Sequence, residues 1–187
     1  MKMVLIHLAE GYEEVEALTC VDVLRRAGVE AKMVSVTGDL LVRGAHGINI
    51  EADVLFEEAD YDACEMIVLP GGMPGATNLR DHAGLTARIE AFAKAGKPLA
   101  AICAAPLALA AHGALAGKNA TIYPGMESYL AGANPTGGTV TVDGNVITGM
   151  GPALAMEFAL ALVEFLKGAE TKKEVATGLL YDRIGEI

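Results

Sequence analysis

The chain has 187 residues, of which 52% are hydrophobic and 20% charged, and its formal net charge at pH 7 is −10. This composition excludes a disordered protein, and the length suits a single domain over residues 1–187, because domains run to roughly 100–200 residues. The acidic balance offers no basic patch, so neither nucleic acid nor an anionic membrane surface is expected as a partner. With no apolar run of roughly 20 residues and no signal-peptide pattern, the expected location is the cytoplasm.

Strand-like and helix-like segments alternate along the chain. The expected strands are short apolar runs at residues 3–8, 31–36, 65–69 and 99–103. The expected helices are amphipathic or alanine-rich segments at residues 13–27, 85–92, 104–112, 154–165 and 171–180. Between them we expect a small arm at 46–50, a short strand at 121–123 and a hairpin that turns at Asp143-Gly144. The alternation predicts a three-layer α/β sandwich with a mostly parallel sheet, in which ligands bind beyond the carboxyl ends of the strands.

Cys103 is the candidate nucleophile. It ends the apolar run 99–103 and directly precedes the helix expected at 104–112. A thiol at such a turn projects from the sheet edge, and the helix N-terminus would stabilise its thiolate. From position alone, a buried structural cysteine is an equally good interpretation. Cys20 and Cys64 are expected to be inert, and three widely spaced cysteines form neither a disulfide framework nor a metal-binding pair.

Three acids, Glu13, Glu14 and Glu16, crowd the start of the first expected helix. The simplest interpretation is that they interact favourably with the helix dipole. The alternative is that one of them reaches the sheet edge and exchanges a proton with a thiol. Because the geometry of a helix does not let all three face one point, at least two are expected to be solvated.

A glycine-rich turn, Pro70–Gly75, follows the third expected strand. Its glycines would let the backbone come close to a ligand and donate N–H groups to an oxyanion, although a Gly-Gly pair is also a common turn. The motifs of phosphate-binding loops are missing, so a nucleotide is not expected. No histidine has the sequence spacing of a metal site, and neither a metal nor another cofactor is expected.

Four segments together resemble a known family in both content and order. They are AEGYEEVEALTCVDVLRRAG, IVLPGGMPGATNL, AAICAAPLALAAHG and GPALAMEFALALVEFLKG. Over essentially its whole length the chain resembles the ThiJ/PfpI superfamily, and most closely its DJ-1 branch. The resemblance implies a flavodoxin-like fold, which agrees with the pattern of strands and helices, and a homodimer.

The resemblance also implies roles for individual residues. The family's reactive cysteine corresponds to Cys103, and the acid that hydrogen-bonds its sulfur corresponds to Glu16. The N–H groups that line the oxyanion pocket correspond to those of Gly72 and Ala104, with Gly71 beside them.

The chain departs from the family pattern at two positions. Ala104 replaces the histidine that follows the cysteine in the peptidase branch, which argues against a cysteine peptidase. Tyr123 stands where the DJ-1 branch often has a histidine, and tyrosine is a poor base near pH 7 because its pKa is about 10. Glu16 would therefore carry most of the proton transfer. His46 aligns with an arginine of the animal proteins and is expected, like Tyr123, at the periphery of the site.

Two functions are therefore considered. The first is an enzyme that handles reactive dicarbonyls: a glutathione-independent glyoxalase that converts methylglyoxal to lactate, a deglycase that acts on glycated protein, or both. Cys103 would attack the aldehyde and Glu16 would move the proton, without a cofactor. The alternative is a non-enzymatic oxidative-stress sensor or redox-regulated chaperone, in which Cys103 is oxidised to a sulfinic acid.

Overall fold

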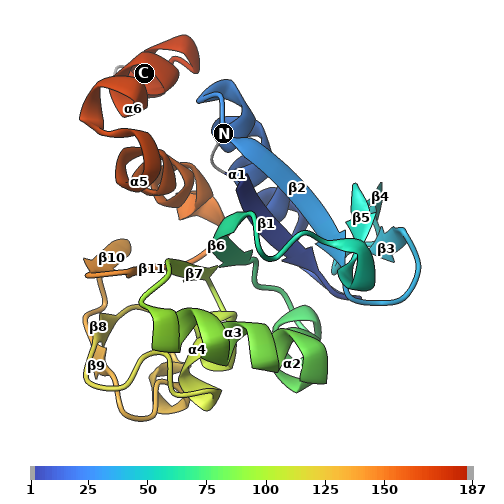
Figure 1. The fold of residues 1–187 in the computed structure, drawn as a ribbon. Coiled ribbons are helices and arrows are strands. Elements are labelled where there is room, and N and C mark those ends of the chain that lie inside the picture. The colour runs from blue at the N-terminus through green and yellow to red at the C-terminus, as the bar shows by residue number, and fades with distance from the viewer. Residues whose placement is uncertain (1–2, 185–187) are drawn as a thin grey trace.

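A seven-stranded sheet forms the middle of the fold in the computed structural model, which describes residues 3–184 (Figure 1). Its strands are β1 (Met3–Leu8), β2 (Glu30–Ser35), β5 (Val54–Leu55), β6 (Cys64–Leu69), β7 (Leu99–Ile102), β10 (Val140–Asp143) and β11 (Val146–Gly149). The order across the sheet is β10-β11-β7-β6-β1-β2-β5, and every neighbouring pair is parallel except β10 with β11.

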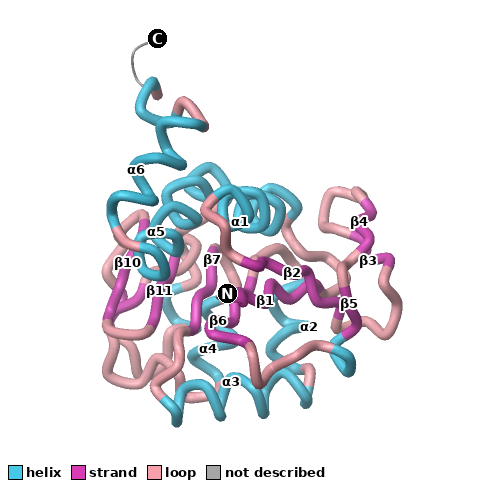
Figure 2. The backbone as a smooth tube through the Cα atoms, turned by 45° about the horizontal axis from the view of Figure 1, so that its top comes forward, coloured by secondary structure: helices cyan, strands magenta, loops and turns pink. Residues whose placement is uncertain are grey.

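Helices cover both faces of this sheet (Figure 2). One face carries α1 (Glu14–Arg26), α5 (Ala155–Lys167) and α6 (Ala169–Gly178), and the other carries α2 (Gly75–Asp81), α3 (Ala83–Ala95) and α4 (Pro106–Ala111). The predicted three-layer α/β sandwich with a mostly parallel sheet is therefore confirmed. Within residues 3–184, no helix combines the length and apolar character that a membrane crossing requires.

The sheet separates two apolar cores, and β1 shows how one strand supplies both. Val4, Ile6 and Leu8 lie in the core beneath α1 and α5, whereas Met3 and Leu5 lie in the core beneath α2, α3 and α4. Successive side chains of a strand point to opposite faces, so a strand buried on both sides must be apolar throughout. Each fully buried aliphatic side chain contributes about 1.5–3 kcal/mol.

Helix α1 forms as its apolar spacing predicts. Ala17, Val21 and Leu24 are buried on one face, which packs against the sheet and α5. On the exposed face the guanidinium of Arg26 contacts the carboxylate of Asp22 at 3.0 Å, one turn earlier. The helix thus places its first turn, which carries the three acids, at the carboxyl end of β1.

Smaller elements lie outside the main sheet. They are the antiparallel pair β3 (Leu41–Arg43) and β4 (Asn49–Glu51), the parallel pair β8 (Asn119–Ala120) and β9 (Asn134–Pro135), and the 3-10 turns Phe56–Glu58, Glu127–Tyr129, Pro152–Leu154 and Tyr181–Arg183. The β3–β4 hairpin, called the arm below, confirms the small arm expected around 46–50.

The predicted strand at 121–123 is wrong. β8 ends at Ala120, and the N–H groups that follow bond elsewhere. The N–H of Thr121 donates to Oγ1 of Thr148 at 2.9 Å, and the N–H of Tyr123 donates to the carbonyl of Cys103 at 2.9 Å. The apolar pattern signalled burial, but these irregular bonds replace a strand ladder.

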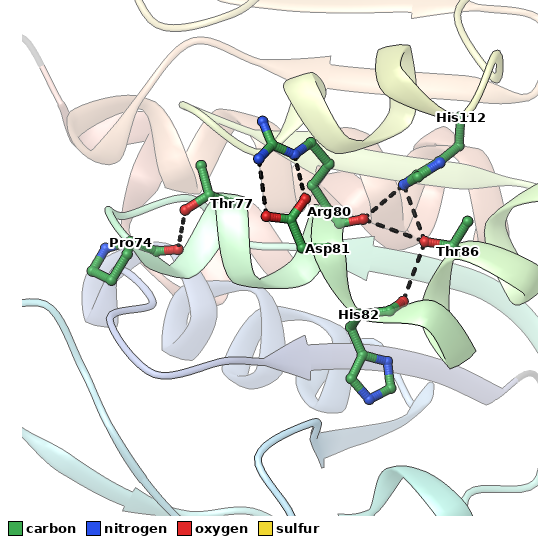
Figure 3. A network of polar contacts seen from close by, with 7 residues as sticks. All are labelled: Pro74, Thr77, Arg80, Asp81, His82, Thr86 and His112. Carbon is green, nitrogen blue, oxygen red and sulfur yellow. Dashed lines mark hydrogen bonds and ion pairs between the residues drawn. The ribbon is translucent and has the colours of Figure 1, made fainter.

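Helix α2 was not predicted, because its seven residues carry too few apolar side chains for a clear period. Figure 3 shows how its end is fixed to α3 and α4. The carbonyl of Arg80 accepts hydrogen bonds from Nε2 of His112 at 2.8 Å and from Oγ1 of Thr86 at 3.3 Å. His112, which ends α4, therefore holds the α2–α3 junction and lies away from Cys103.

Candidate active site

The loops that follow three neighbouring strands meet at one edge of the sheet. β7, β6 and β1 lie side by side and run parallel, so their carboxyl ends share that edge. The chain continues from β7 into Cys103, from β6 into Gly71 and Gly72, and from β1 into the first turn of α1 with Glu16. Topology thus brings together residues that are far apart in the sequence.

Cys103 stands on a sharp turn between β7 and α4. Its φ of 61° is left-handed; among the described non-glycine residues only Leu180 shares this feature. Its N–H donates to the carbonyl of Gly149, and its carbonyl accepts from the N–H of Tyr123, both at 2.9 Å. Such a conformation costs of order 1–3 kcal/mol and persists only where its surroundings enforce it. Cys103 as a whole residue is 8% exposed, so it is more covered than the sequence suggested.

Glu16 lies against the sulfur and is fully buried. Its side chain hydrogen-bonds Cys103, and its Oε2 accepts from the N–H of Gly71 at 2.7 Å. Its other oxygen, Oε1, has no partner among the described protein atoms. An unpaired buried oxygen is costly as an acceptor, so this carboxyl is suited to holding a proton.

Gly71 and Gly72 make the close approach possible. A Cβ on Gly71 would lie 2.7 Å from Cβ of Cys103 and 2.8 Å from Oε2 of Glu16, so no side chain fits there. Gly72 has a φ of 86°, and a Cβ on it would lie 2.5 Å from the carbonyl oxygen of Gly11. The backbone N–H groups of Gly72 and Ala104 both hydrogen-bond the sulfur of Cys103.

The pKa values of Cys103 and Glu16 differ from those expected for a thiolate that only a helix N-terminus stabilises. Burial raises the pKa of Glu16 to about 7. Burial and the negative charge of Glu16 raise the pKa of the Cys103 thiol to about 12, against the hydrogen bonds from Gly72 and Ala104. Near neutral pH the Glu16 carboxyl therefore changes between its ionised and protonated forms while the Cys103 thiol keeps its proton. A thiolate forms at Cys103 when ionised Glu16 takes the proton of the thiol.

The prediction that at least two of the three acids are solvated is wrong, because all three are buried. Glu13 caps α1: its Oε2 accepts from the N–H of Glu16 at 2.8 Å. Glu14 accepts from the backbone N–H of His46 at 2.7 Å and contacts Nδ1 of the same residue at 2.8 Å. The arm covers these carboxylates, which a reading of one helix could not foresee.

The contact between Glu14 and His46 favours the charged form of both side chains. Burial alone would raise the pKa of Glu14, but hydrogen bonds from the His46 ring and from backbone N–H groups hold it below its usual value. The same hydrogen bond raises the pKa of His46, whose ring is otherwise exposed. Ligand atoms of Glu13, Glu14 and His46 lie within 4.8 Å of one another and could also receive a metal ion, although the Glu14–His46 contact accounts for their arrangement without one.

We expect an NMR titration of the His46 ring to give a pKa above 6.5, and Glu14→Gln to move it back toward that value. The stabilising contact is complete while His46 is charged and Glu14 ionised. It weakens as pH rises through the pKa of His46, and again as pH falls through that of Glu14. His112, on the opposite face of the sheet, is the internal control. If Glu14→Gln leaves the pKa of His46 unchanged, the contact between the two side chains does not form in solution.

The remaining candidates are placed as follows. Cys20 and Cys64 are fully buried in the two cores, and burial raises the pKa of Cys64 to about 11, as befits unreactive thiols. Tyr123 reaches the site through its backbone bond to Cys103, while its side chain is 47% exposed and lies against Gly151. Sequence reasoning missed this backbone bond, for which the only signal was the apolar stretch before Pro124.

Residues 2–165 match the model of the DJ-1/PfpI family. The chain belongs to this family. It is 38% identical over 181 residues to Protein dj-1beta of Drosophila melanogaster, which covers 96% of this chain and 97% of that protein. It spans only 41% of Protein DJ-1 homolog B of Arabidopsis thaliana, with 38% identity over 178 residues.

Two further members of the DJ-1/PfpI family bear on the site. The chain is 32% identical over 162 residues to the Caenorhabditis elegans protein named glutathione-independent glyoxalase DJR-1.2, and the match covers 86% of each protein. The solved structure of Toxoplasma gondii DJ-1, described as oxidized, superposes with a TM-score of 0.92 at 39% identity and covers 96% of this chain and 98% of its own. Both the family and the DJ-1 fold predicted from the sequence are thus confirmed.

Proposed function

We propose that this protein is a glutathione-independent glyoxalase that converts methylglyoxal to lactate, with Cys103 as nucleophile and Glu16 as general acid and base. The observation that carries the proposal is the contact between Cys103 and the buried carboxyl of Glu16, beside two backbone N–H donors at a nearly closed sheet edge. A relative of the same family that is named a glyoxalase supports it.

The chemistry begins with an addition that needs both members of the pair. Ionised Glu16 takes the proton of the Cys103 thiol as the sulfur bonds to the aldehyde carbon, the carbonyl electron pair moves to oxygen, and Glu16 passes the proton to that oxygen. Until it is protonated, the oxygen accepts from the N–H groups of Gly72 and Ala104. The product is a hemithioacetal, and Glu16 is now an ionised base.

Proton transfer between the two carbons completes the reaction. Glu16 removes the proton from the former aldehyde carbon and the ketone oxygen is protonated, which gives an enediol. Glu16 then returns a proton to the neighbouring carbon as the hydroxyl on the sulfur-bearing carbon loses its proton, the proton that the ketone oxygen took up, which leaves a thioester of lactate on Cys103. Water adds to this thioester, and lactate leaves while the sulfur recovers its original state. No net oxidation occurs and no cofactor is needed. With an adduct of methylglyoxal on protein as substrate, the Cys103 sulfur would replace the amine or thiol of that protein at the former aldehyde carbon, the displaced group would leave with a proton from Glu16, and the later steps would be the same.

A second candidate is a redox sensor or redox-regulated chaperone. It is favoured by the unpartnered Oε1 of Glu16, which could donate a hydrogen bond to a sulfinate when protonated, and by a related structure described as oxidized. In this alternative Cys103 loses electrons to peroxide and gains two oxygen atoms. A cysteine peptidase is disfavoured, because Ala104 supplies no imidazole next to the thiol.

We also propose that the protein is a homodimer that works in the cytoplasm. Exposed apolar side chains gather on α1 and the arm, namely Val15, Leu18, Leu41 and Ile48. A second copy that covers them would remove apolar surface from water next to the site.

The test is to incubate reduced protein with methylglyoxal, without glutathione, and to follow lactate by NMR in deuterated water. We expect many equivalents of lactate per protein, with deuterium on the carbon that Glu16 reprotonates, because an enediol route exchanges with solvent. Protein alkylated at Cys103 is the control from the same preparation. No lactate above this control, together with a gain of two oxygens on Cys103 under mild peroxide, would reject the enzyme in favour of the sensor.

A further inference from the structure

A cavity of about 320 Å³ opens beside the Cys103 turn. Tyr123 and Pro124 line it from one side, and residues 150–154, which follow β11, line it from the other. Since β11 lies next to β7 and runs parallel to it, this loop leaves the sheet at the edge that holds Cys103. The cavity has no part in the proposed proton transfer.

Both sides of the cavity are bonded to the backbone of Cys103. The Tyr123 N–H donates to the Cys103 carbonyl, and the Cys103 N–H donates to the carbonyl of Gly149, which directly precedes Met150 of the cavity. Backbone hydrogen bonds therefore connect both sides of the cavity to the turn that carries the nucleophile.

The lining is apolar and carries no group that is charged near neutral pH. Pro124, Met150 and Leu154 contribute hydrocarbon or thioether, and the only polar side-chain atom is the hydroxyl of Tyr123. The Tyr123 ring lies next to Gly151, where a Cβ would make an ordinary contact with Cδ2 of the ring at 3.5 Å. A cavity of this kind gains free energy when it removes apolar surface from water.

From this geometry we infer that the cavity binds the apolar substituent of an α-oxoaldehyde, and that the protein prefers bulky aryl or branched alkyl oxoaldehydes to glyoxal, which has no substituent. This inference rests on the proposed glyoxalase function. The polar end of the substrate would meet Gly72, Ala104 and Glu16, while the substituent would lie between Tyr123 and residues 150–154. Tyr123 would thus determine specificity where relatives use a histidine.

The first experiment compares kcat/KM for phenylglyoxal and glyoxal in three proteins. For the natural protein we expect a ratio of at least ~10 in favour of phenylglyoxal, since even one methylene in an apolar pocket can give about tenfold discrimination. Ala153→Phe, which fills the cavity, is expected to remove that preference by lowering kcat/KM for phenylglyoxal more than for glyoxal. Ala169→Phe, a matched change at the start of α6, should change neither. A ratio near 1 in the natural protein, or a ratio unmoved by Ala153→Phe, would overturn the inference.

A second experiment does not depend on turnover and separates the two proposals. Phenacyl bromide and bromoacetone both alkylate a thiolate, with a new sulfur–carbon bond and loss of bromide, and differ in their aryl and methyl groups. Rates at Cys103, read by intact mass and divided by rates with a small free thiol, should favour phenacyl bromide by at least ~10-fold, and Ala153→Phe should abolish this. Preference in alkylation without any turnover would keep the cavity and reject the glyoxalase. Turnover without preference in alkylation would keep the glyoxalase and reject the role of the cavity.

Discussion

Replacing Cys103 by alanine is expected to lower kcat/KM for methylglyoxal by roughly 10³-fold or more, because no other group in the site can form the covalent intermediate. Alanine keeps the Cβ that packs against Gly71 and the backbone that bonds to Gly149 and Tyr123. The free energy of unfolding should therefore change by no more than about 1 kcal/mol. The measurements are lactate formation and chemical denaturation.

Cys64→Ala is the matched control. Cys64 is as buried as a cysteine can be, but it begins β6 at the opposite edge of the sheet, where its thiol donates to the carbonyl of Met66 at 3.2 Å. Its loss should cost about 1 kcal/mol of stability and leave kcat/KM within a factor of two. Lactate formation that survives in Cys103→Ala would contradict the proposed nucleophile.

Glu16→Gln is expected to lower kcat/KM by ~10²–10⁴-fold, the usual contribution of a general acid or base. The amide has nearly the shape of the carboxyl and can still accept from the N–H of Gly71, but it cannot give up or take a proton at the enediol step. Because addition to the aldehyde also uses Glu16, we expect the hemithioacetal with phenylglyoxal to form more slowly as well. Lactate formation and the mass of the Cys103 adduct are the measurements.

The same substitution should change how stability depends on pH. The pKa of Glu16 rises from its ordinary 4.5 to about 7 in the folded protein, so the folded state holds a proton that the unfolded state releases. Stability therefore falls as pH increases from about 4.5 to about 7. At pH 8 the cost is on the order of 3 kcal/mol, and Glu16→Gln should recover much of it.

The control for this pH effect is Glu164→Gln. The exposed carboxylate of Glu164 in α5 contacts Lys172 in α6. The comparison uses the difference in unfolding free energy between natural protein and variant, measured from pH 5 to pH 8, because other groups titrate in the same range. For Glu164→Gln the difference should stay flat. A flat difference for Glu16→Gln as well would mean that this carboxyl is ionised throughout and cannot serve as the acid.

The sequence predicts the sheet well, because a strand buried on both faces must be apolar along its whole length. β1, β6 and β7 were located in this way, and α1 and α5 by their apolar spacing. Helix α2 is not predicted, because seven residues with few buried side chains show no clear helical period of apolar residues. The stretch 121–123 was misread because burial and strand structure give the same apolar pattern over so few residues.

The sequence predicted which residues form the candidate site, but it did not predict their burial or their pKa values. The family resemblance pointed to Cys103 and Glu16, and the structure places them in contact. The burial of Glu13 and Glu14 depends on the arm, and the high pKa of the Cys103 thiol depends on its burial and then on the carboxyl of Glu16, which follows a different strand. Both are long-range effects, and a local pattern of residues contains no information about them.

The two N–H groups at the sulfur, from Gly72 and Ala104, have a consequence for how the protein would behave in an oxidising cell. The oxygen of a bound aldehyde and the oxygens of an oxidised sulfur would need the same two donors. Under the proposed glyoxalase function, a molecule oxidised at Cys103 would be unable to act on an aldehyde. The activity left in a population would then decrease with the amount of oxidant it has encountered.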